Sequence, residues 1–117
     1  MTTQEIAVTL VELCRAGKLD EAYPTLFADN AVHIEGTGEV TTGLSAILAN
    51  AEAFDAETAV SDVTVQGPFV HGDQFALHYA MTMTTKATGA SMPFAEVALY
   101  EVSNGKIVSE KFLYGVG

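Results

Sequence analysis

Hydrophobic residues in the first half of the chain recur every three or four positions, which is the period of an α-helix. Ile6 and Leu10 begin one such stripe, and Gly17 is typical of a position just past a helix end. The spacing predicts three helices, over about residues 3–16, 20–27 and 44–54.

From about residue 58 the period changes to two, which is typical of half-buried strands. Phe75, Leu77 and Tyr79 alternate with smaller or polar residues, and Asn104-Gly105 is a strong hairpin signal. We expect Gly67-Pro68 to break a strand, because proline cannot donate to a strand ladder. The predicted strands cover residues 31–35, 58–66, 69–71, 75–86, 94–102 and 106–114.

Helices come first in the chain and strands afterwards. This segregation predicts an α+β fold in which helices pack on one face of a curved, mostly antiparallel sheet. An Asp29-Asn30 turn is expected to separate the second helix from the first strand. The sequence shows no linker or internal repeat, so we expect residues 1–117 to form one domain.

The composition limits the classes of partner. The 117 residues carry a net charge of −10, which predicts that neither nucleic acid nor a membrane surface is a partner. No apolar run approaches the ~18 residues of a membrane span, and the N-terminus has no signal-type segment. The expected location is therefore the cytoplasm. Cys14 falls within a helical stripe and is expected to be a buried thiol.

His33 and Glu35 are the first candidates for chemistry. They lie two residues apart in a predicted strand and therefore share one face. One interpretation is a pocket pair in which each side chain tunes the proton affinity of the other. The alternative is that Val32 and Ile34 take the buried face and the pair points at water. The pattern alone leaves both open.

Several large residues at strand spacing can either line a cavity or form the core. These residues are Tyr79, Met81, Met83, Phe94, Tyr100 and Phe112. The three histidines are dispersed, so no metal site is expected. Gly36-Thr37-Gly38 lacks the third glycine and the helix start of a phosphate-binding loop, so no nucleotide cofactor is expected either.

Three ordered blocks give the chain a family resemblance. Residues 16–32 contain Ala-Gly-Lys-Leu-Asp and Leu-Phe-Ala-Asp-Asn-Ala-Val, residues 43–47 open the third helix, and residues 99–108 read Leu-Tyr-Glu-Val-Ser-Asn-Gly-Lys-Ile-Val. Together they resemble the nuclear-transport-factor-2-like superfamily, particularly its SnoaL-like branch. The resemblance implies a cystatin-like cone of curved sheet with three N-terminal helices on its concave face, an apolar pocket, and dimerisation through the outer sheet face.

Members of this superfamily include ketosteroid isomerases and polyketide cyclases, so the resemblance implies a fold and not one activity. The isomerase base corresponds to Glu35. The isomerase tyrosine corresponds to Leu10 and its protonated acid to about Ala98, although Glu96 lies two residues away on the same strand face. The catalytic aspartate of the cyclases corresponds to Phe112, which argues against their mechanism here.

The expected function is binding of a small hydrophobic molecule, without a cofactor or metal. The alternative is a cofactor-free isomerase, lyase or hydrolase in which Glu35 is the general base and His33 its partner. Glu35 is expected inside the cavity and His33 at its mouth. The expected pocket residues are Tyr79, Met81, Glu96, Tyr100 and Phe112. A homodimer is expected through the face formed by Ala76, His78, Ala80, Thr82 and Thr84.

Overall fold

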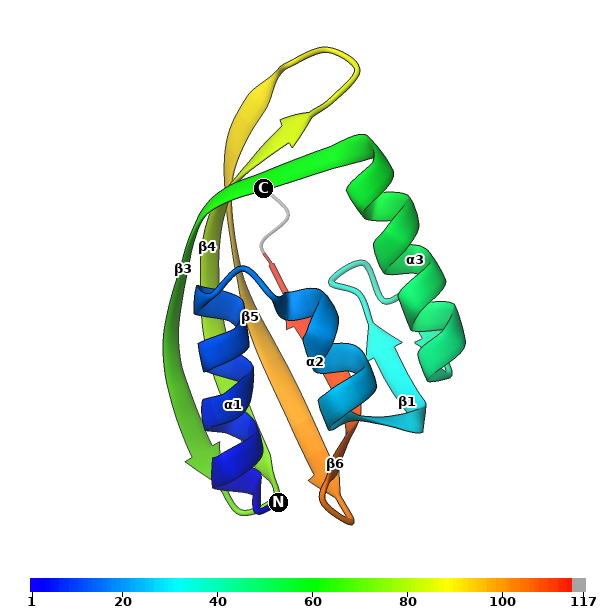
Figure 1. Ribbon diagram of the computed structural model, residues 1–117, viewed down its shortest axis with the longest axis vertical. Coiled ribbons are helices and arrows are strands. Elements are labelled where there is room, and N and C mark those ends of the chain that lie inside the picture. Colours follow the sequence, from blue (N-terminus) through cyan, green and yellow to red (C-terminus); the bar gives the residue numbers. More distant parts are fainter. Residues whose placement is uncertain (115–117) are drawn as a thin grey trace.

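The structure is a computed structural model that describes residues 1–114. Three helices and six strands follow one another along these residues (Figure 1). The helices are α1 (Thr3–Arg15), α2 (Leu19–Leu26) and α3 (Leu44–Glu57). The strands are β1 (Phe27–Ile34), β2 (Val40–Thr42), β3 (Thr58–His71), β4 (Gln74–Thr85), β5 (Ser91–Ser103) and β6 (Lys106–Leu113).

The strands form one sheet in the order β2-β1-β6-β5-β4-β3. Within the described residues, β1 and β6 run parallel and every other neighbouring pair runs antiparallel. Figure 1 shows the long strands bending around α1 and α2, with α3 on the same side of the sheet near β1. The predicted α+β cone of curved, mostly antiparallel sheet with helices on its concave face is confirmed.

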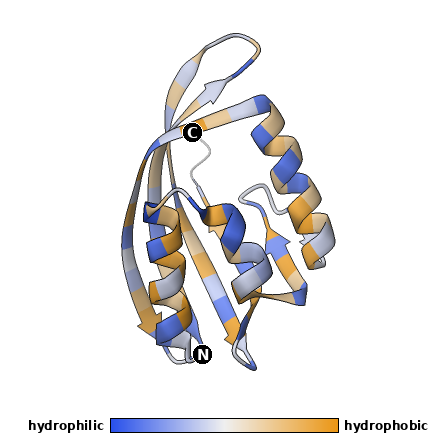
Figure 2. Cartoon of the chain, in the orientation of Figure 1, coloured by the Kyte–Doolittle hydropathy of each residue, from blue (hydrophilic) through white to orange (hydrophobic). Residues whose placement is uncertain are grey.

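A hydrophobic core lies between α1 and the sheet. Ile6 and Leu10 of α1 are fully buried, as are Phe75 and Leu77 of β4 and Ile107 of β6. Burial along β4 alternates from Phe75 to Tyr79, as the period of two predicts. Hydrophobic and hydrophilic positions likewise interchange along the elements in Figure 2. This packing fixes where the inward-facing side chains of β4–β6 point.

The predicted Asp29-Asn30 turn is wrong. α2 passes directly into β1 at Phe27, and both residues lie within that strand. The register between β1 and β6 shifts between Phe27 and Val32, so the two turn-forming residues occupy an irregular stretch of strand and stay exposed. Their polar side chains therefore signal a bulge and not a chain reversal.

The expected break at Gly67-Pro68 is also wrong, because β3 continues through it to His71. The register with β4 shifts between Gln66 and Phe69, which absorbs the proline as a bulge. Gly67 has a φ of 118°, and a Cβ there would lie 3.0 Å from the carbonyl oxygen of Ala76. Only glycine fits this bend. Within residues 1–114, no helix has the length and hydrophobicity needed to span a membrane.

Candidate active site

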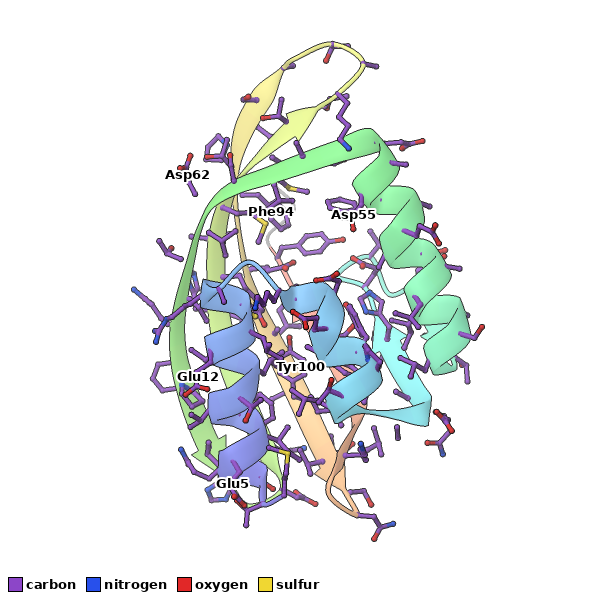
Figure 3. The ribbon with its side chains drawn as sticks, viewed as in Figure 1. Glu5, Glu12, Asp55, Asp62, Phe94 and Tyr100 are labelled. Carbon is purple, nitrogen blue, oxygen red and sulfur yellow. The ribbon has the colours of Figure 1, made fainter. Side chains whose placement is uncertain are left out.

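A cavity of about 1130 Å³ opens between α3 and the concave face of the sheet. Its lining includes Leu48 and Phe54 of α3 together with Val60 and Val63 of β3. All four side chains are partly exposed. The cavity wall therefore presents apolar surface to the open space. Figure 3 shows Asp55 on the α3 side of the opening and Phe94 on the sheet side.

A chain of three titratable side chains crosses one wall. His33 lies opposite Glu110 in the parallel pairing of β1 with β6. Its Nδ1 is 2.7 Å from Oε1 of Glu110, and its Nε2 is 2.6 Å from Oε1 of Glu35. Both ring nitrogens therefore face carboxylates, and an imidazole can donate to both only when it carries two protons.

The pKa of His33 reflects this arrangement. Burial of the ring opposes its positive charge, but the hydrogen bonds and charges of Glu110 and Glu35 outweigh burial and raise the pKa of His33 from 6.5 to about 9. At neutral pH the ring is thus an imidazolium held between two carboxylates. Because neither nitrogen is free, His33 organises the wall and does not itself offer a base to a ligand.

Glu110 is the site residue that the sequence reasoning missed. Its side chain is buried, and its Oε1 also accepts a long hydrogen bond of 3.4 Å from the hydroxyl of Tyr23. Burial raises the pKa of Glu110, while the hydrogen bond from His33 opposes that rise. One signal could have found it: Glu110 is two residues before Phe112 in β6 and so shares the inward face.

Glu35 lies at the mouth of the cavity and His33 lies deeper, which reverses the expected order. The side chain of Glu35 is 40% exposed and that of His33 is 14% exposed. The hydroxyl of Tyr114 donates to Oε2 of Glu35 at 3.0 Å. The ring of Tyr114 packs on Gly36, where a Cβ would come within 2.6 Å of a ring carbon. Gly36 is therefore the residue that lets Tyr114 reach Glu35.

Glu96 is a second carboxyl in the wall, contributed by β5 between Phe94 and Ala98. Burial and, to a lesser degree, the charges of Glu35 and Glu110 raise the pKa of Glu96 from 4.5 to about 7, while the charge of His33 opposes them. Among residues 1–114, no side chain forms an ion pair or hydrogen bond with it. Glu96 is thus an unpaired acid that faces the cavity.

Two tyrosines form the deep part of the wall. The hydroxyls of Tyr79 and Tyr100 lie 2.9 Å apart, and Sγ of Cys14 is 3.6 Å from the hydroxyl of Tyr79. Tyr100 also stacks on Phe75, with ring centroids 4.8 Å apart. Burial raises the pKa of both tyrosines above the ordinary value of 10, so both hydroxyls stay protonated and can donate.

The remaining predicted residues also fall on or beside the cavity. Met81 and Phe112 line it and are partly buried, and the ring of Phe112 lies 5.0 Å from that of His33. Leu10 and Ala98, which correspond to the isomerase tyrosine and acid, are buried and apolar. In the described part of the chain, no three His, Cys, Asp or Glu side chains are placed to hold a metal ion.

Comparison with known proteins identifies the family. A family model described as "SnoaL-like domain" matches residues 1–114, and the chain therefore belongs to the SnoaL-like domain family. One solved structure, from Mesorhizobium loti, is 37% identical to this chain. That protein is described as a SnoaL-like polyketide cyclase and also as a carbohydrate phosphatase. That match covers 97% of this chain and 100% of the other, with a TM-score of 0.92.

More distant structures share the fold. A protein from Pseudomonas putida described as a polyketide cyclase is 18% identical, and the match covers 99% of this chain and 93% of the other, with a TM-score of 0.79. A ketosteroid-isomerase-like protein from Catenulispora acidiphila, in complex with trimethylamine, is 21% identical with coverages of 98% and 88% and a TM-score of 0.74. No match was found among curated proteins.

Proposed function

We propose that this protein binds a small, largely apolar molecule in the cavity and catalyses a proton transfer on it, with Glu96 as the acid–base group. The observation that carries the proposal is the Glu96 carboxyl, which has no ion pair or side-chain hydrogen bond in the described chain and lies on a cavity wall rich in apolar side chains. Burial and the charges of Glu35 and Glu110 raise its pKa to about 7. A group with that pKa is present in both protonation states at neutral pH. It can therefore remove a proton and return it.

The reaction class follows from the groups near Glu96. Its carboxylate takes a proton from a carbon next to a carbonyl, and the electron pair of the broken C–H bond moves onto the carbonyl oxygen. A protonated hydroxyl of Tyr79 can donate a hydrogen bond to that oxygen as its charge grows. Return of the proton to another atom gives an isomerase, and loss of a leaving group gives a lyase.

Glu35 is the alternative base. Its two carboxylate oxygens are already engaged, one with His33 and the other with Tyr114, and it lies at the exposed mouth. These contacts suit a residue that shapes the entrance. We therefore assign the proton transfer to Glu96 and expect the Glu35–His33–Glu110 chain to hold the wall in place and set its charge.

An elimination probe tests this assignment without knowledge of the natural substrate. A general base in an apolar site removes the C–H proton of 5-nitrobenzisoxazole, the N–O bond breaks, and a coloured cyanophenolate forms. We expect the protein to accelerate this reaction with an inflection near pH 7, and Glu96→Gln to lower the rate by about 10²-fold or more.

Glu101→Gln is the matched control, because Glu101 lies on the same strand but on the opposite, exposed face. It should keep the full rate. A Glu96→Gln protein that keeps the rate would contradict the assignment. If Glu35→Gln abolishes the rate in its place, the base is Glu35.

A second candidate function is ligand binding without turnover. It is favoured by the pairing of most polar groups in the wall with one another: His33 with Glu35 and Glu110, and Tyr79 with Tyr100. In that case 5-nitrobenzisoxazole should bind saturably, as measured by calorimetry, with no rate enhancement in either the parent or Glu96→Gln.

We also propose that two copies associate through the outer face of the sheet. The small and weakly polar residues Ala76, His78 and Ala80 of β4 lie on this face, and Val97 and Leu99 of β5 expose apolar surface on it. Few charges would need desolvation in such a contact. Lys111 of β6 pairs with Leu99, and Glu101 lies two residues along β5 from Leu99, so the charged residues beside this patch have opposite signs and can pair across a two-fold axis.

Light scattering tests the dimer proposal. The parent should give about twice the chain mass of 12.3 kDa at micromolar concentration. Leu99→Glu should give the monomer mass, while Val8→Glu, at an exposed apolar position on α1, should remain a dimer. A parent that scatters as a monomer would contradict the proposal.

A further inference from the structure

The charges that line the cavity are strongly one-sided. Seven of the lining residues are Asp or Glu, whereas no lysine or arginine is among the lining residues of the described chain. The positive charge of the wall is that of His33, which two carboxylates already hold. The cavity therefore contains more negative charge than its own groups neutralise, and Glu96 is the part of that charge without a partner.

Aromatic rings lie beside this unpaired carboxyl. Phe94 precedes Glu96 by two residues on the same face of β5, and the rings of Phe94 and Tyr114 meet edge to face with centroids 5.3 Å apart. Phe112 of β6 and Tyr79 of β4 also line the cavity, and Tyr79 pairs directly with Glu96 in the sheet. Faces of aromatic rings carry partial negative charge and attract cations.

We infer that the molecule bound in the cavity carries a protonated amine or quaternary ammonium group on a small apolar body. This inference rests on the proposed function, because it names the substrate class of the same cavity. The apolar body lies against Leu48, Phe54 and the valines of β3, and the cationic group lies between the Phe94–Tyr114 pair and Glu96. One carboxylate oxygen of Glu96 accepts a hydrogen bond or charge contact from the ammonium group, and the other oxygen stays free for the proton transfer.

The alternatives are disfavoured by the same charges. An anionic ligand would have to lie among Glu35, Glu96 and Glu110, and residues 1–114 contribute no lysine or arginine to the wall that could pair with it. A neutral ligand would not compensate the negative charge of Glu96. An ammonium group is the one ligand class that both neutralises Glu96 and gains from the aromatic rings.

Three probes with one apolar body test the inference. These are 4-phenylbutylamine, 4-phenylbutan-1-ol and 4-phenylbutanoate, which present an ammonium, a hydroxyl and a carboxylate on the same chain. Titration calorimetry at about pH 8 keeps the amine protonated and Glu96 ionised. We expect the amine to bind about tenfold more tightly than the alcohol, and the carboxylate to bind most weakly.

Matched variants locate the preference. Glu96→Gln should reduce the amine-to-alcohol ratio to about threefold or less and leave the affinity for the alcohol nearly unchanged. Glu101→Gln removes the same charge from the outer face and should keep the parent ratio.

The outcomes separate this inference from the proposed function. If the alcohol binds as tightly as the amine, or the carboxylate binds more tightly, the inference is wrong while the proposal of an apolar binding site stands. If none of the three probes binds, both are wrong. If the preference for the amine survives unchanged in Glu96→Gln, the placement of the ammonium group beside Glu96 is wrong.

Discussion

The two ends of the sheet are covered by helices in different ways. At the end under α1, side chains such as Ile6 and Leu77 are buried and fill the space between helix and sheet. At the end under α3, Ile47 is the buried residue of the helix, and Leu48 and Phe54 stay partly exposed on the cavity wall. Helix α1 completes the hydrophobic core, whereas helix α3 forms one wall of the cavity.

This difference separates residues that hold the fold from residues that are free to serve a ligand. Apolar side chains that line an open cavity lose the burial that a close-packed core would give them, which is one reason why we propose that this surface binds a ligand. Two acidic residues of the cavity show the same contrast between a packed and an open environment. Glu110 is hydrogen-bonded to His33 and Tyr23, whereas Glu96 faces the cavity and has no side-chain partner among residues 1–114.

The largest effect should come from a pair of matched truncations. Leu77→Ala empties a position that is 1% exposed, so we expect a loss of about 2–5 kcal/mol in the free energy of unfolding. Leu48→Ala, at a cavity position that is 38% exposed, should lose less than about 1 kcal/mol. Urea unfolding of both variants measures the difference, and equal losses would mean that α3 closes a core as α1 does.

A second effect concerns the charged wall. Glu110→Gln removes the carboxylate that faces Nδ1 of His33, so the pKa of His33 should fall from about 9 by about one pH unit or more. Because the folded-state pKa is raised, the contribution of the His33 pairs to stability is complete below about pH 6.5 and is lost as the pH rises through 9.

Loss of the buried pair should also lower the free energy of unfolding by about 1–3 kcal/mol at neutral pH. NMR titration of the His33 ring gives its pKa in the parent, in Glu110→Gln and in Glu35→Gln. The Glu35 variant should shift it less, since Glu35 is the more exposed partner. A larger pKa shift in Glu35→Gln than in Glu110→Gln would mean that Glu35, and not Glu110, is the stronger partner of His33.

A smaller effect concerns the stability cost of the unpaired acid. The pKa of Glu96 in the folded protein is raised from 4.5 to about 7, so its ionisation destabilises the fold. That cost is absent below about pH 4.5 and complete above about pH 7. The free energy of unfolding of Glu96→Gln, relative to that of the parent, should therefore rise as the pH increases from about 4.5 to about 7 and stay higher above pH 7. The full difference should be of order 1 kcal/mol after allowance for partial exposure of the side chain.

Urea unfolding at several pH values measures this gain, with Glu101→Gln as the variant that should show none. A Glu96→Gln protein whose stability follows that of the parent at every pH would show that Glu96 is solvated.

The sequence predicted the fold better than the site. The change from a period near 3.6 to a period of two identified the three helices and five of the six strands of the described residues, because core packing imposes those periods directly. The short strand β2 was not predicted, since its three residues are too few to show a period. The prediction failed at Asp29-Asn30 and Gly67-Pro68, where a strand accommodates turn-forming residues in a bulge that depends on its neighbouring strand. Such irregularities are set by pairing and not by local preference.

The pairing of strands also explains what was missed in the site. His33 and Glu35 could be placed on one face from their spacing, but Glu110 joins them only through the parallel pairing of β1 with β6, 77 residues along the chain. The depth order of His33 and Glu35 was wrong because depth is set by where the strand ends relative to α3 and Tyr114. Neither relation is encoded in a local pattern.

The most direct test of the account is the titration of one carboxyl. Carbon-13 NMR of the glutamate side chains, with the Glu96 signal assigned by its loss in Glu96→Gln, gives the pKa of Glu96 in the folded protein. We predict a value of about 7, set by burial and by the charges of Glu35 and Glu110. A value at or below 4.5 would mean a solvated or ion-paired carboxyl and would contradict its role as the acid–base group of the cavity.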